Sequence, residues 1–489
     1  MDRWNTKAYP WLIQGGMGIG VSGWKLASAV ATTGQLGVVS GTALDTVFIR
    51  RLQDEGVSPV VQECFDAFPN QEIVGNILAR YDRPRHSHSS PYRLLPMYSH
   101  HSPAARDDVT VLAAFVEVSL AKRGHTGVIG INLLTKVQFP TVPTLFGAML
   151  AGVDVVLMGA GIPRAIPGVL DKLSALEPVN LKIDGVGKLP DGFERSFLPD
   201  RYTVSSPLDR PAFLPIVSSV ALATMMVRKA SGAVEGFVIE GPTAGGHNAP
   251  PRGAPVYDDR GQPVYGERDV VDLKAFCDLG YPFWLAGGMN SPERVSQAME
   301  QGATGVQVGT LFALSRESGM SATLREQMYT KVVAKTAVIT TDPRASSTGF
   351  PFKVVELEGT VSQQSTYEMR ERICDLGYLR EAYVSDKGSI KYRCSAEPIQ
   401  AHLLHGGTLE ATLGRKCLCN ALFATIGLGQ KRLHEDEPPI VTSGDDLAAI
   451  LPLVRAHHGE FTAADVVQYL QPRSVNEATL GEATLAKTH

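Results

Sequence analysis

The sequence predicts an α/β protein folded as a (β/α)8 TIM barrel, with a long insertion after strand 2 and a C-terminal, mostly helical extension. Eight short apolar runs alternate with helical segments over the first 310 residues, an order typical of a parallel sheet. These runs are rich in Val and Ile and end in Gly, as expected of strands that are buried on both faces. The composition, with 44% hydrophobic and 20% charged residues, is that of an ordinary globular protein.

The predicted strands follow one another at the spacing of strand–helix units. They are Trp11–Gln14, Leu36–Ser40, Val128–Leu133, Val153–Met158, Phe213–Ser218, Gly236–Glu240, Pro282–Ala286 and Gly305–Val308. The predicted helices are Trp24–Thr33, Leu44–Glu55, Thr144–Ala151, Ala165–Leu176, Val220–Ala230, Val270–Leu279, Pro292–Gln301 and one beginning near Leu311. A ninth apolar run, Val179–Ile183, leads into a turn-rich stretch and Arg201–Val204, so we interpret this pair as a hairpin outside the barrel.

Two segments do not fit the repeat. Residues 56–126 are far too long for an ordinary connection, so we predict an inserted subdomain or lid within the barrel domain of residues 1–335. Residues 336–489 lose the alternation and are predicted to form an extension packed on the barrel. In this extension we expect a loop, a charged helix and an apolar stretch, at Asp342–Phe352, Tyr367–Leu376 and Leu418–Leu428.

Charge and hydropathy exclude several classes of protein. The 46 basic and 50 acidic residues give a net charge of −4, which provides no basic field for nucleic acid or an anionic membrane. The longest apolar window, Leu145–Ile162, carries Asp154 at its centre and is a poor membrane span. The first residues lack the apolar core of a signal peptide, and six cysteines are too few for a disulfide scaffold. We therefore expect a cytoplasmic protein.

Glycine-rich loops follow several predicted strands. The pattern Gly18-Ile-Gly20-Val-Ser-Gly23 satisfies a dinucleotide-binding motif, but no acidic residue ends the next strand, as that motif requires. A tight turn at the barrel mouth is the alternative. The loops Gly287–Gly288 and Gly309–Thr310 follow the seventh and eighth strands, where barrel enzymes commonly bind a phosphate. Plain turn glycines are the other interpretation of these loops.

His247 is the candidate catalytic residue. It lies in the glycine-rich loop from Glu240 to Asn248, directly after the sixth strand and so at the catalytic face of the predicted barrel. A histidine titrates near neutral pH and suits proton transfer. Since the chain contains twelve histidines, an ordinary turn or surface histidine remains the alternative.

Five motifs occur in the order found in one family of enzymes. They are Gln14-Gly15-Gly16-Met17, Gly130-Ile131-Asn132-Leu133, Gly241-x-x-x-Gly245-Gly246-His247, Ala286-Gly287-Gly288-Met289 and Gly305-Val306-Gln307-Val308-Gly309-Thr310. Together they resemble the nitronate monooxygenase (formerly 2-nitropropane dioxygenase) family, which is related to flavin-dependent enoyl-acyl-carrier-protein reductases. The resemblance covers about residues 10–315.

This resemblance implies an FMN-binding barrel with His247 as the base that removes a proton from a nitroalkane or steadies a bound nitronate. The implied cofactor-binding residues are Gln14, Gly15, Gly16, Met17, Asn132, Ser218, Glu240, Gly245, Gly246, Gly287, Gly288, Gly309 and Thr310. Of these, the glycines after the seventh and eighth strands and Thr310 would hold the phosphate, and the first motif would lie against the flavin ring.

The resemblance leaves more than one function open. The chain reads Gly15-Gly16 where the family commonly has Ala-Pro, and Thr243 and Glu240 replace the family's usual Glu and Gln. A nitronate monooxygenase would use O2 to convert a nitronate to a carbonyl compound and nitrite. The alternative is an NAD(P)H-dependent reductase of enoyl thioesters on an acyl carrier protein, and a third is a flavin-binding module without catalysis. We also expect the chain to form a homodimer.

The reductase alternative needs a basic surface for an acidic carrier protein, and the insertion offers one. The arginines concerned are Arg80, Arg83, Arg85 and Arg93.

Cysteine and histidine clusters give weak metal signals. Four cysteines lie in the extension, at Cys374, Cys394, Cys417 and Cys419, and four histidines in the insertion, at His86, His88, His100 and His101. Zinc or an iron–sulfur cluster is one interpretation, but no C-x-x-C pair is present, which favours inert thiols. Ser and Pro around the histidines favour a loop. We predict no metal site, and we predict that the acidic run 434–437 is a solvated turn.

Overall fold

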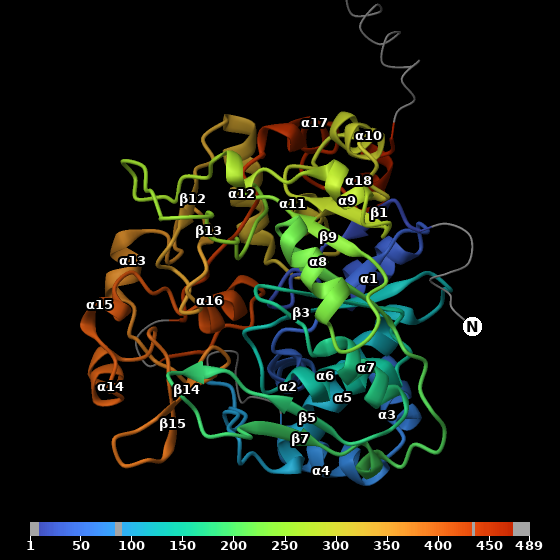
Figure 1. The fold of residues 1–489 in the computed structure, drawn as a ribbon, viewed down its shortest axis with the longest axis vertical. Helices are drawn as coiled ribbons and strands as arrows, with labels where there is room; N and C mark the ends of the chain where they lie inside the picture. Colours follow the sequence, from blue (N-terminus) through green and yellow to red (C-terminus); the bar gives the residue numbers. More distant parts are fainter. Residues whose placement is uncertain (1–8, 84–89, 433–435, 473–489) are drawn as a thin grey trace, which may run out of the picture.

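Eight parallel strands form a barrel at the centre of the computed structural model, which describes residues 9–83, 90–432 and 436–472 (Figure 1). The strands are β1 (Leu12–Gln14), β2 (Gly37–Ser40), β3 (Ile129–Leu134), β4 (Val155–Gly159), β8 (Ala212–Val217), β9 (Phe237–Glu240), β10 (Phe283–Ala286) and β11 (Gly305–Val308). Their order around the sheet is β1-β11-β10-β9-β8-β4-β3-β2. A parallel bridge between Ile13 and Leu36 joins β1 to β2 and closes the ring. The predicted barrel and its eight strands are confirmed.

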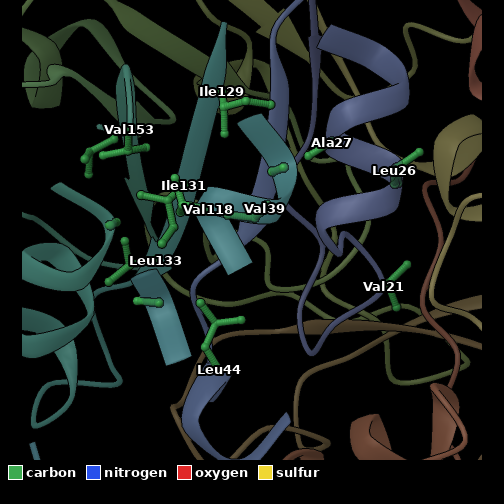
Figure 2. Packing of buried hydrophobic residues seen from close by; sticks show 14 of the residues in the cluster. Val21, Leu26, Ala27, Val39, Leu44, Val118, Ile129, Ile131, Leu133 and Val153 are labelled. Carbon is green, nitrogen blue, oxygen red and sulfur yellow. The ribbon is translucent and has the colours of Figure 1, made fainter. Parts of the chain in front are cut away.

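The barrel has two hydrophobic cores because successive side chains of a strand point to opposite faces. Alternate residues such as Ile13, Val38 and Leu157 fill the interior. The residues between them, such as Val39 and Ile131, point outward and pack against helices. Figure 2 shows this outer core, in which β2 and β3 meet the neighbouring helices through Val39, Ile131 and Val118. The carboxyl ends of the strands lie outside these two cores and carry polar residues.

A ring of helices covers the outside of the barrel. It contains α1 (Trp24–Ala31), α2 (Leu44–Glu55), α6 (Thr141–Leu150), α7 (Ile166–Ser174), α8 (Val220–Lys229), α9 (Leu273–Cys277), α10 (Pro292–Glu300) and α11 (Thr310–Leu314). The helix predicted for 270–279 is only one turn, and α6 begins three residues earlier than expected. The other predicted helices agree within two residues at each end.

The insertion between β2 and β3 is helical. It contains α3 (Pro59–Ala67), α4 (Gln71–Tyr81) and α5 (Ala104–Lys122). Helix α5 is buried along most of its length and packs against α1, α2 and α6, so it belongs to the ring itself. A function of this insertion as a lid stays a prediction.

A second excursion lies between α7 and β8. It contains β5 (Val179–Lys182), β6 (Gly185–Val186), β7 (Glu194–Phe197) and the single turn η1 (Pro199–Tyr202). The predicted hairpin exists, but its returning strand is β7 and not Arg201–Val204. Arg201 lies in η1 because its guanidinium pairs with Asp108 of α5, at 2.6 Å between Nη2 and Oδ2.

The extension begins with α12 (Ala322–Ala334) and ends with α17 (Leu451–Ala456) and α18 (Ala463–Tyr469), which pack on α12 and α1, respectively. Between them lies the C-terminal layer, by which we mean the described residues of 339–445. It lies beside the barrel in Figure 1, with its outer part in orange. It contains β12 (Ile339–Asp342), β13 (Phe352–Val355), α13 (Gln364–Met369), β14 (Glu381–Val384), β15 (Ile390–Arg393), α14 (Ile399–Leu404), α15 (Leu409–Thr412) and α16 (Leu418–Thr425).

Two details of the C-terminal layer differ from the prediction. Helix α13 ends at Met369 because the next residue, Arg370, turns inward to pair with Glu437. Glu437 is 5% exposed and also pairs with Arg432, so the end of the acidic run is buried and is not a solvated turn. Residues 434 and 435 of that run lie outside the described residues.

None of the described helices is long and apolar enough to cross a bilayer. The apolar window around Asp154 instead divides into α6 and β4, and Asp154 accepts a hydrogen bond from Lys122.

Candidate functional site

A cavity of about 250 Å³ lies at the carboxyl ends of the barrel strands. Its walls come from the loops after β1, β2, β3, β4, β9, β10 and β11, which is the face where TIM-barrel enzymes place their active sites. The C-terminal layer forms the remaining wall, with side chains such as Phe352, Leu418 and Leu422. The site therefore lies between the barrel and the C-terminal layer.

Most of the residues predicted from the sequence line this cavity. They are Gly15, Gly16, Met17, Asn132, Glu240, Gly245, Gly246, His247, Gly287, Gly288, Gly309 and Thr310. The structure thus brings together residues from the carboxyl ends of five barrel strands. Gln14 and Ser218 are absent from the cavity wall.

Gln14 supports the wall from behind. Its side chain is fully buried and its amide nitrogen donates to Gly15 O and Ser22 Oγ, over 2.5 and 2.8 Å. Its amide oxygen accepts from the backbone N–H of Val38 on β2. Because both ends of the amide are engaged in this way, Gln14 joins β1 to β2 and holds the loop behind the cavity. This supporting position is what the structure shows for Gln14, and its direct contact with a cofactor stays a prediction.

Ser218 follows β8, whose last residue is Val217. Its carbonyl oxygen accepts a hydrogen bond from Arg252 over 2.7 Å. The residue of this strand that lines the cavity is Ile216. The strand therefore contributes an apolar surface where a polar flavin contact was expected.

The loop after β1 lies close to β3. Asn132 Nδ2 donates to the carbonyl oxygen of Gly16 over 3.1 Å. A Cβ at Gly16 would overlap the Cβ of Asn132, so only glycine allows this approach. Together Gly15, Gly16 and Asn132 make a flat wall formed largely of backbone.

The glycine loops after β9, β10 and β11 form a second wall of the cavity. Gly287 has a φ of +95°, and a Cβ there would lie 2.9 Å from Thr243 Oγ1. Thr310 Oγ1 accepts from the backbone N–H of Gly444 over 3.0 Å, which leaves its own hydroxyl proton for another acceptor. The first turn of α10 is capped by the Ser291 side chain, whereas α11 begins directly at the cavity with no side-chain cap.

Glu240 ends β9 at the cavity wall. Burial raises the pKa of its carboxyl group to about 8, because an anion is poorly solvated inside the protein. At neutral pH Glu240 therefore carries a proton and can donate a hydrogen bond.

His247 lines the same cavity as Glu240. Its Nε2 is 2.7 Å from Ser346 Oγ, and its ring packs edge-on against Phe352, with 4.9 Å between centroids. Burial lowers the pKa of His247 to about 4, so the imidazole is neutral at physiological pH and has one ring nitrogen free of a proton. A neutral imidazole in a closed cavity is suited to accept a proton from a bound molecule.

Several residues of the site were not predicted from the sequence. Ser346, Ser443 and Gly444 come from the C-terminal layer, which carries none of the five motifs. Gln307 lies within the last motif and lines the cavity, and its buried Oε1 has no hydrogen-bond partner in the described structure. Its place inside a recognised motif was the one signal that could have identified it.

These walls fit the FMN that the sequence leads us to expect. The wall at Gly15 and Gly16 presents largely backbone to the cavity, and Gln307 Oε1 offers an acceptor that still needs a donor. No Lys or Arg occurs among the residues described as lining the cavity, so a phosphate would be bound by backbone N–H groups and by the hydroxyl groups of Thr310 and Ser443.

The four cysteines of the extension come together beside this cavity. Cys374, Cys394, Cys417 and Cys419 surround a small second pocket, and Cys419 also lines the main cavity. All six cysteines are free thiols. Within the described ranges no three His, Cys, Asp or Glu side chains are arranged to hold a metal ion. Of the four histidines in the insertion, His86 and His88 lie outside the described residues.

Comparison with known families supports a relationship for part of the chain. A family model described as nitronate monooxygenase matches residues 208–396, which include the loops after β8, β9, β10 and β11. A nitronate monooxygenase of Pseudomonas aeruginosa is 36% identical over 124 residues, equal to 25% of this chain. The match spans a third (33%) of the length of that curated relative.

The solved structures that resemble this chain have low sequence identity to it. FabK from Thermotoga maritima is 15% identical with a TM-score of 0.48, and the match covers 98% of this chain and 96% of FabK. A nitroalkane oxidase from Streptomyces ansochromogenes is 13% identical with a TM-score of 0.46, covering 98% and 97%. The enoyl reductase domain of MlnA from Bacillus amyloliquefaciens is 13% identical with a TM-score of 0.48, covering 97% and 95%.

Proposed function

We propose that this protein is an FMN-dependent oxidoreductase that oxidises nitroalkanes or nitronates with O2. The premise is that over residues 208–396 the chain belongs to the nitronate monooxygenase family. The products would be a carbonyl compound and nitrite. The observation that carries the proposal is His247, a neutral histidine that lines a cavity together with glycine-rich loops.

Each wall of the cavity has a part in this reaction. FMN, when bound, supplies the electron transfer and the reaction with O2. Gly287, Gly288, Gly309 and Thr310 would hold its phosphate, while Gly15, Gly16 and Asn132 would lie beside its ring. His247 would take the α-proton of a neutral nitroalkane, and the C–H bonding electrons would stay on the substrate as the nitronate anion. The C-terminal layer would keep water away from this step.

An anaerobic visible spectrum of the purified protein tests the proposal. A flavin band at about 450 nm that a nitronate bleaches and O2 restores would support the proposed function. A colourless protein that reconstitution with FMN leaves unchanged would refute it. In His247→Ala, the proposal expects loss of activity toward the neutral nitroalkane and retention of activity toward the preformed nitronate, since the anion needs no base.

An NAD(P)H-dependent enoyl reductase is the second candidate, and the apolar wall favours it. Leu379, Leu418, Leu422 and Ile440 of the C-terminal layer continue the cavity beyond the glycine loops and would accommodate an acyl chain. Arg80, Arg83 and Arg93 are exposed on the insertion, and Arg93 donates to the carbonyl oxygen of Arg80. Arg85 lies outside the described residues. Rapid bleaching of the flavin band by NADPH would select this candidate.

The remaining expectations are also proposals. We infer that FMN is the cofactor, that an acidic acyl carrier protein would dock near these arginines only in the reductase case, and that the protein works in the cytoplasm. Equilibrium sedimentation would test the expected homodimer, and binding of an acyl carrier protein to wild type and Arg93→Glu would test the docking surface.

A further inference from the structure

The catalytic candidate His247 has a hydrogen-bond partner that comes from the C-terminal layer. Ser346 is fully buried, and its Oγ lies 2.7 Å from His247 Nε2. It follows β12 in the loop before β13, about 100 residues from His247 in the chain. None of the motifs that the resemblance rests on includes Ser346.

The hydrogen bonds of Ser346 continue to Thr348. The two hydroxyl oxygens are 2.8 Å apart, and the backbone N–H of Thr348 donates to Ser346 Oγ over 3.2 Å. The backbone N–H of Phe350 in turn donates to Thr348 Oγ1. Ser346 Oγ can thus accept from Nε2–H of His247 while it donates its own proton to Thr348, with each of its hydrogen-bonding positions used.

Three contacts fix the backbone of this loop, and two of them join it to the His247 loop. Asn248 N donates to Pro351 O and Lys353 N donates to Gly246 O, over 2.9 and 3.0 Å, so the loop end runs as a strand beside the histidine. On the other side, the guanidinium of Arg415 donates to the carbonyl oxygen of Ser346. Because the backbone is fixed on both sides, the position of the Ser346 hydroxyl is set before substrate binds.

We propose that Ser346, backed by Thr348, is a positioning residue for His247. It holds the ring by Nε2, and it accepts the Nε2–H of the imidazolium once Nδ1 has taken the substrate proton. This inference rests on the proposed role of His247 as the base. In the described structure Nε2 makes the side-chain hydrogen bond of His247, which leaves Nδ1 for the proton from the substrate. A new N–H bond forms at Nδ1, the substrate C–H bond breaks, and its electron pair stays on the nitronate.

The groups around the ring are mostly neutral. Phe352 covers one edge from β13, and Glu240 on β9 lines the same cavity and is protonated at neutral pH. Arg415 reaches the carbonyl oxygen of Ser346, and its contact is with the backbone and not with the ring. The Ser346 hydroxyl, which accepts the Nε2–H, is therefore the group placed to stabilise the imidazolium.

The test compares Ser346→Ala, Ser346→Thr and the matched control Ser362→Ala. Ser362 lies in the same layer and hydrogen-bonds to Thr360 and Leu357, away from His247. We expect Ser346→Ala to lower kcat for a neutral nitroalkane about 10- to 100-fold, with KM and the oxidation of preformed nitronate unchanged. Ser346→Thr should restore most of the rate, and Ser362→Ala should leave all three quantities at their wild-type values.

A second readout does not depend on catalysis. In protein labelled with ¹⁵N-histidine, His247→Ala identifies the ring signals of His247, and Ser346→Ala should shift the Nε2 signal toward that of an unbonded nitrogen. Unchanged ring signals together with an unchanged kcat would overturn the proposal. If the wild-type protein oxidises no nitronate at all, the proposed function fails, while the nitrogen signals still decide whether Ser346 holds the ring.

Discussion

Asn132 Nδ2 donates to the carbonyl oxygen of Gly16 over 3.1 Å, and this bond ties the third strand of the barrel to the loop after the first. The two residues are so close that a Cβ at Gly16 would overlap Asn132. We therefore expect Gly16→Ala to push the loop away from β3. The free energy of unfolding should fall by about 1–3 kcal/mol, as for other overpacked sites, and FMN should bind at least about tenfold more weakly.

Denaturant unfolding and fluorescence titration with FMN measure these two effects. Gly75→Ala is the matched control, because Gly75 lies within α4 and a Cβ there would have no neighbour within 4 Å. This control should gain about 0.5–1 kcal/mol from the higher helix propensity of alanine and should leave FMN binding unchanged. Equal FMN affinity in Gly16→Ala and wild type would contradict the close approach that we describe.

Tyr378 carries the second prediction. Its hydroxyl donates to the fully buried Asp45 over 2.5 Å, and Asp45 also pairs with Arg106 of α5 at 2.6 Å. This network joins α2, the insertion and the C-terminal layer beside the cavity. Tyr378→Phe should lower the free energy of unfolding by about 1.5–3 kcal/mol, the range for a hydrogen bond to a charged group.

Tyr257→Phe is the control for Tyr378→Phe, since Tyr257 is 52% exposed and its replacement should change stability by less than about 0.5 kcal/mol. Urea unfolding of both variants measures the difference. A Tyr378→Phe protein as stable as its control would show that the Asp45–Arg106 pair holds the layer without the tyrosine.

The barrel could be predicted because each of its strands shows its own local signal. Apolar runs identify all eight strands, and six of these runs are followed directly by glycine. The insertion was harder, because α5 buries Asp107, Asp108 and Glu117, which weaken its apolar pattern. Those acids are paired with arginines distant in sequence, such as Arg195 and Arg201 in the excursion before β8. Pairings of this kind depend on tertiary contacts, so the membership of α5 in the ring could not be read from local sequence.

The residues of the candidate site fall into the same two groups, those that local sequence identifies and those that depend on tertiary contacts. His247, Glu240 and the glycines follow directly after strands, and the barrel topology alone brings such positions to one face. Gly444 reaches the cavity and Ser346 reaches His247 only because the C-terminal layer folds back over the barrel, and neither residue belongs to a periodic pattern or motif. The direct cofactor contact of Gln14 stays a prediction. Its motif predicts nearness to the cavity, but strand alternation turns its side chain into the wall.

Glu240→Gln should show a stability effect that depends on pH. The pKa of Glu240 is raised from 4.5 to about 8, so between these values the folded protein retains a proton that the unfolded chain releases. Its contribution to stability is therefore full below about pH 4.5 and is lost as the pH rises toward 8, by up to about 1.4 kcal/mol per pH unit. Relative to wild type, Glu240→Gln should gain stability across this window.

Thermal unfolding from pH 4.5 to 9 measures this gain for the apoprotein. The exposed Glu267→Gln serves as the control for the change in charge. A constant difference between Glu240→Gln and wild type over the whole range would mean that Glu240 ionises normally in the folded state.

Gln307 allows a test of the cofactor site with two effects of opposite sign. Its buried Oε1 has no partner in the described structure, and an unsatisfied buried oxygen costs about 1–3 kcal/mol. Gln307→Leu should therefore stabilise the apoprotein and at the same time weaken FMN binding, because the ligand loses an acceptor. Unfolding of the apoprotein and an FMN titration supply the two measurements. Loss of stability without loss of affinity would place this oxygen outside the cofactor site.

His247 should give the oxidation of a neutral nitroalkane an unusual pH profile. Burial lowers its pKa to about 4, so the ring stays unprotonated, and able to act as a base, well below the usual value of 6.5. On the acid side, kcat/KM should stay level from neutral pH down to about pH 5 and should decline only as the pH approaches 4. The same measurement on preformed nitronate corrects for other groups, because that substrate bypasses the base. A decline centred near pH 6.5 for the nitroalkane alone would show that His247 is solvated in the working enzyme, and the closed cavity would then no longer account for its chemistry.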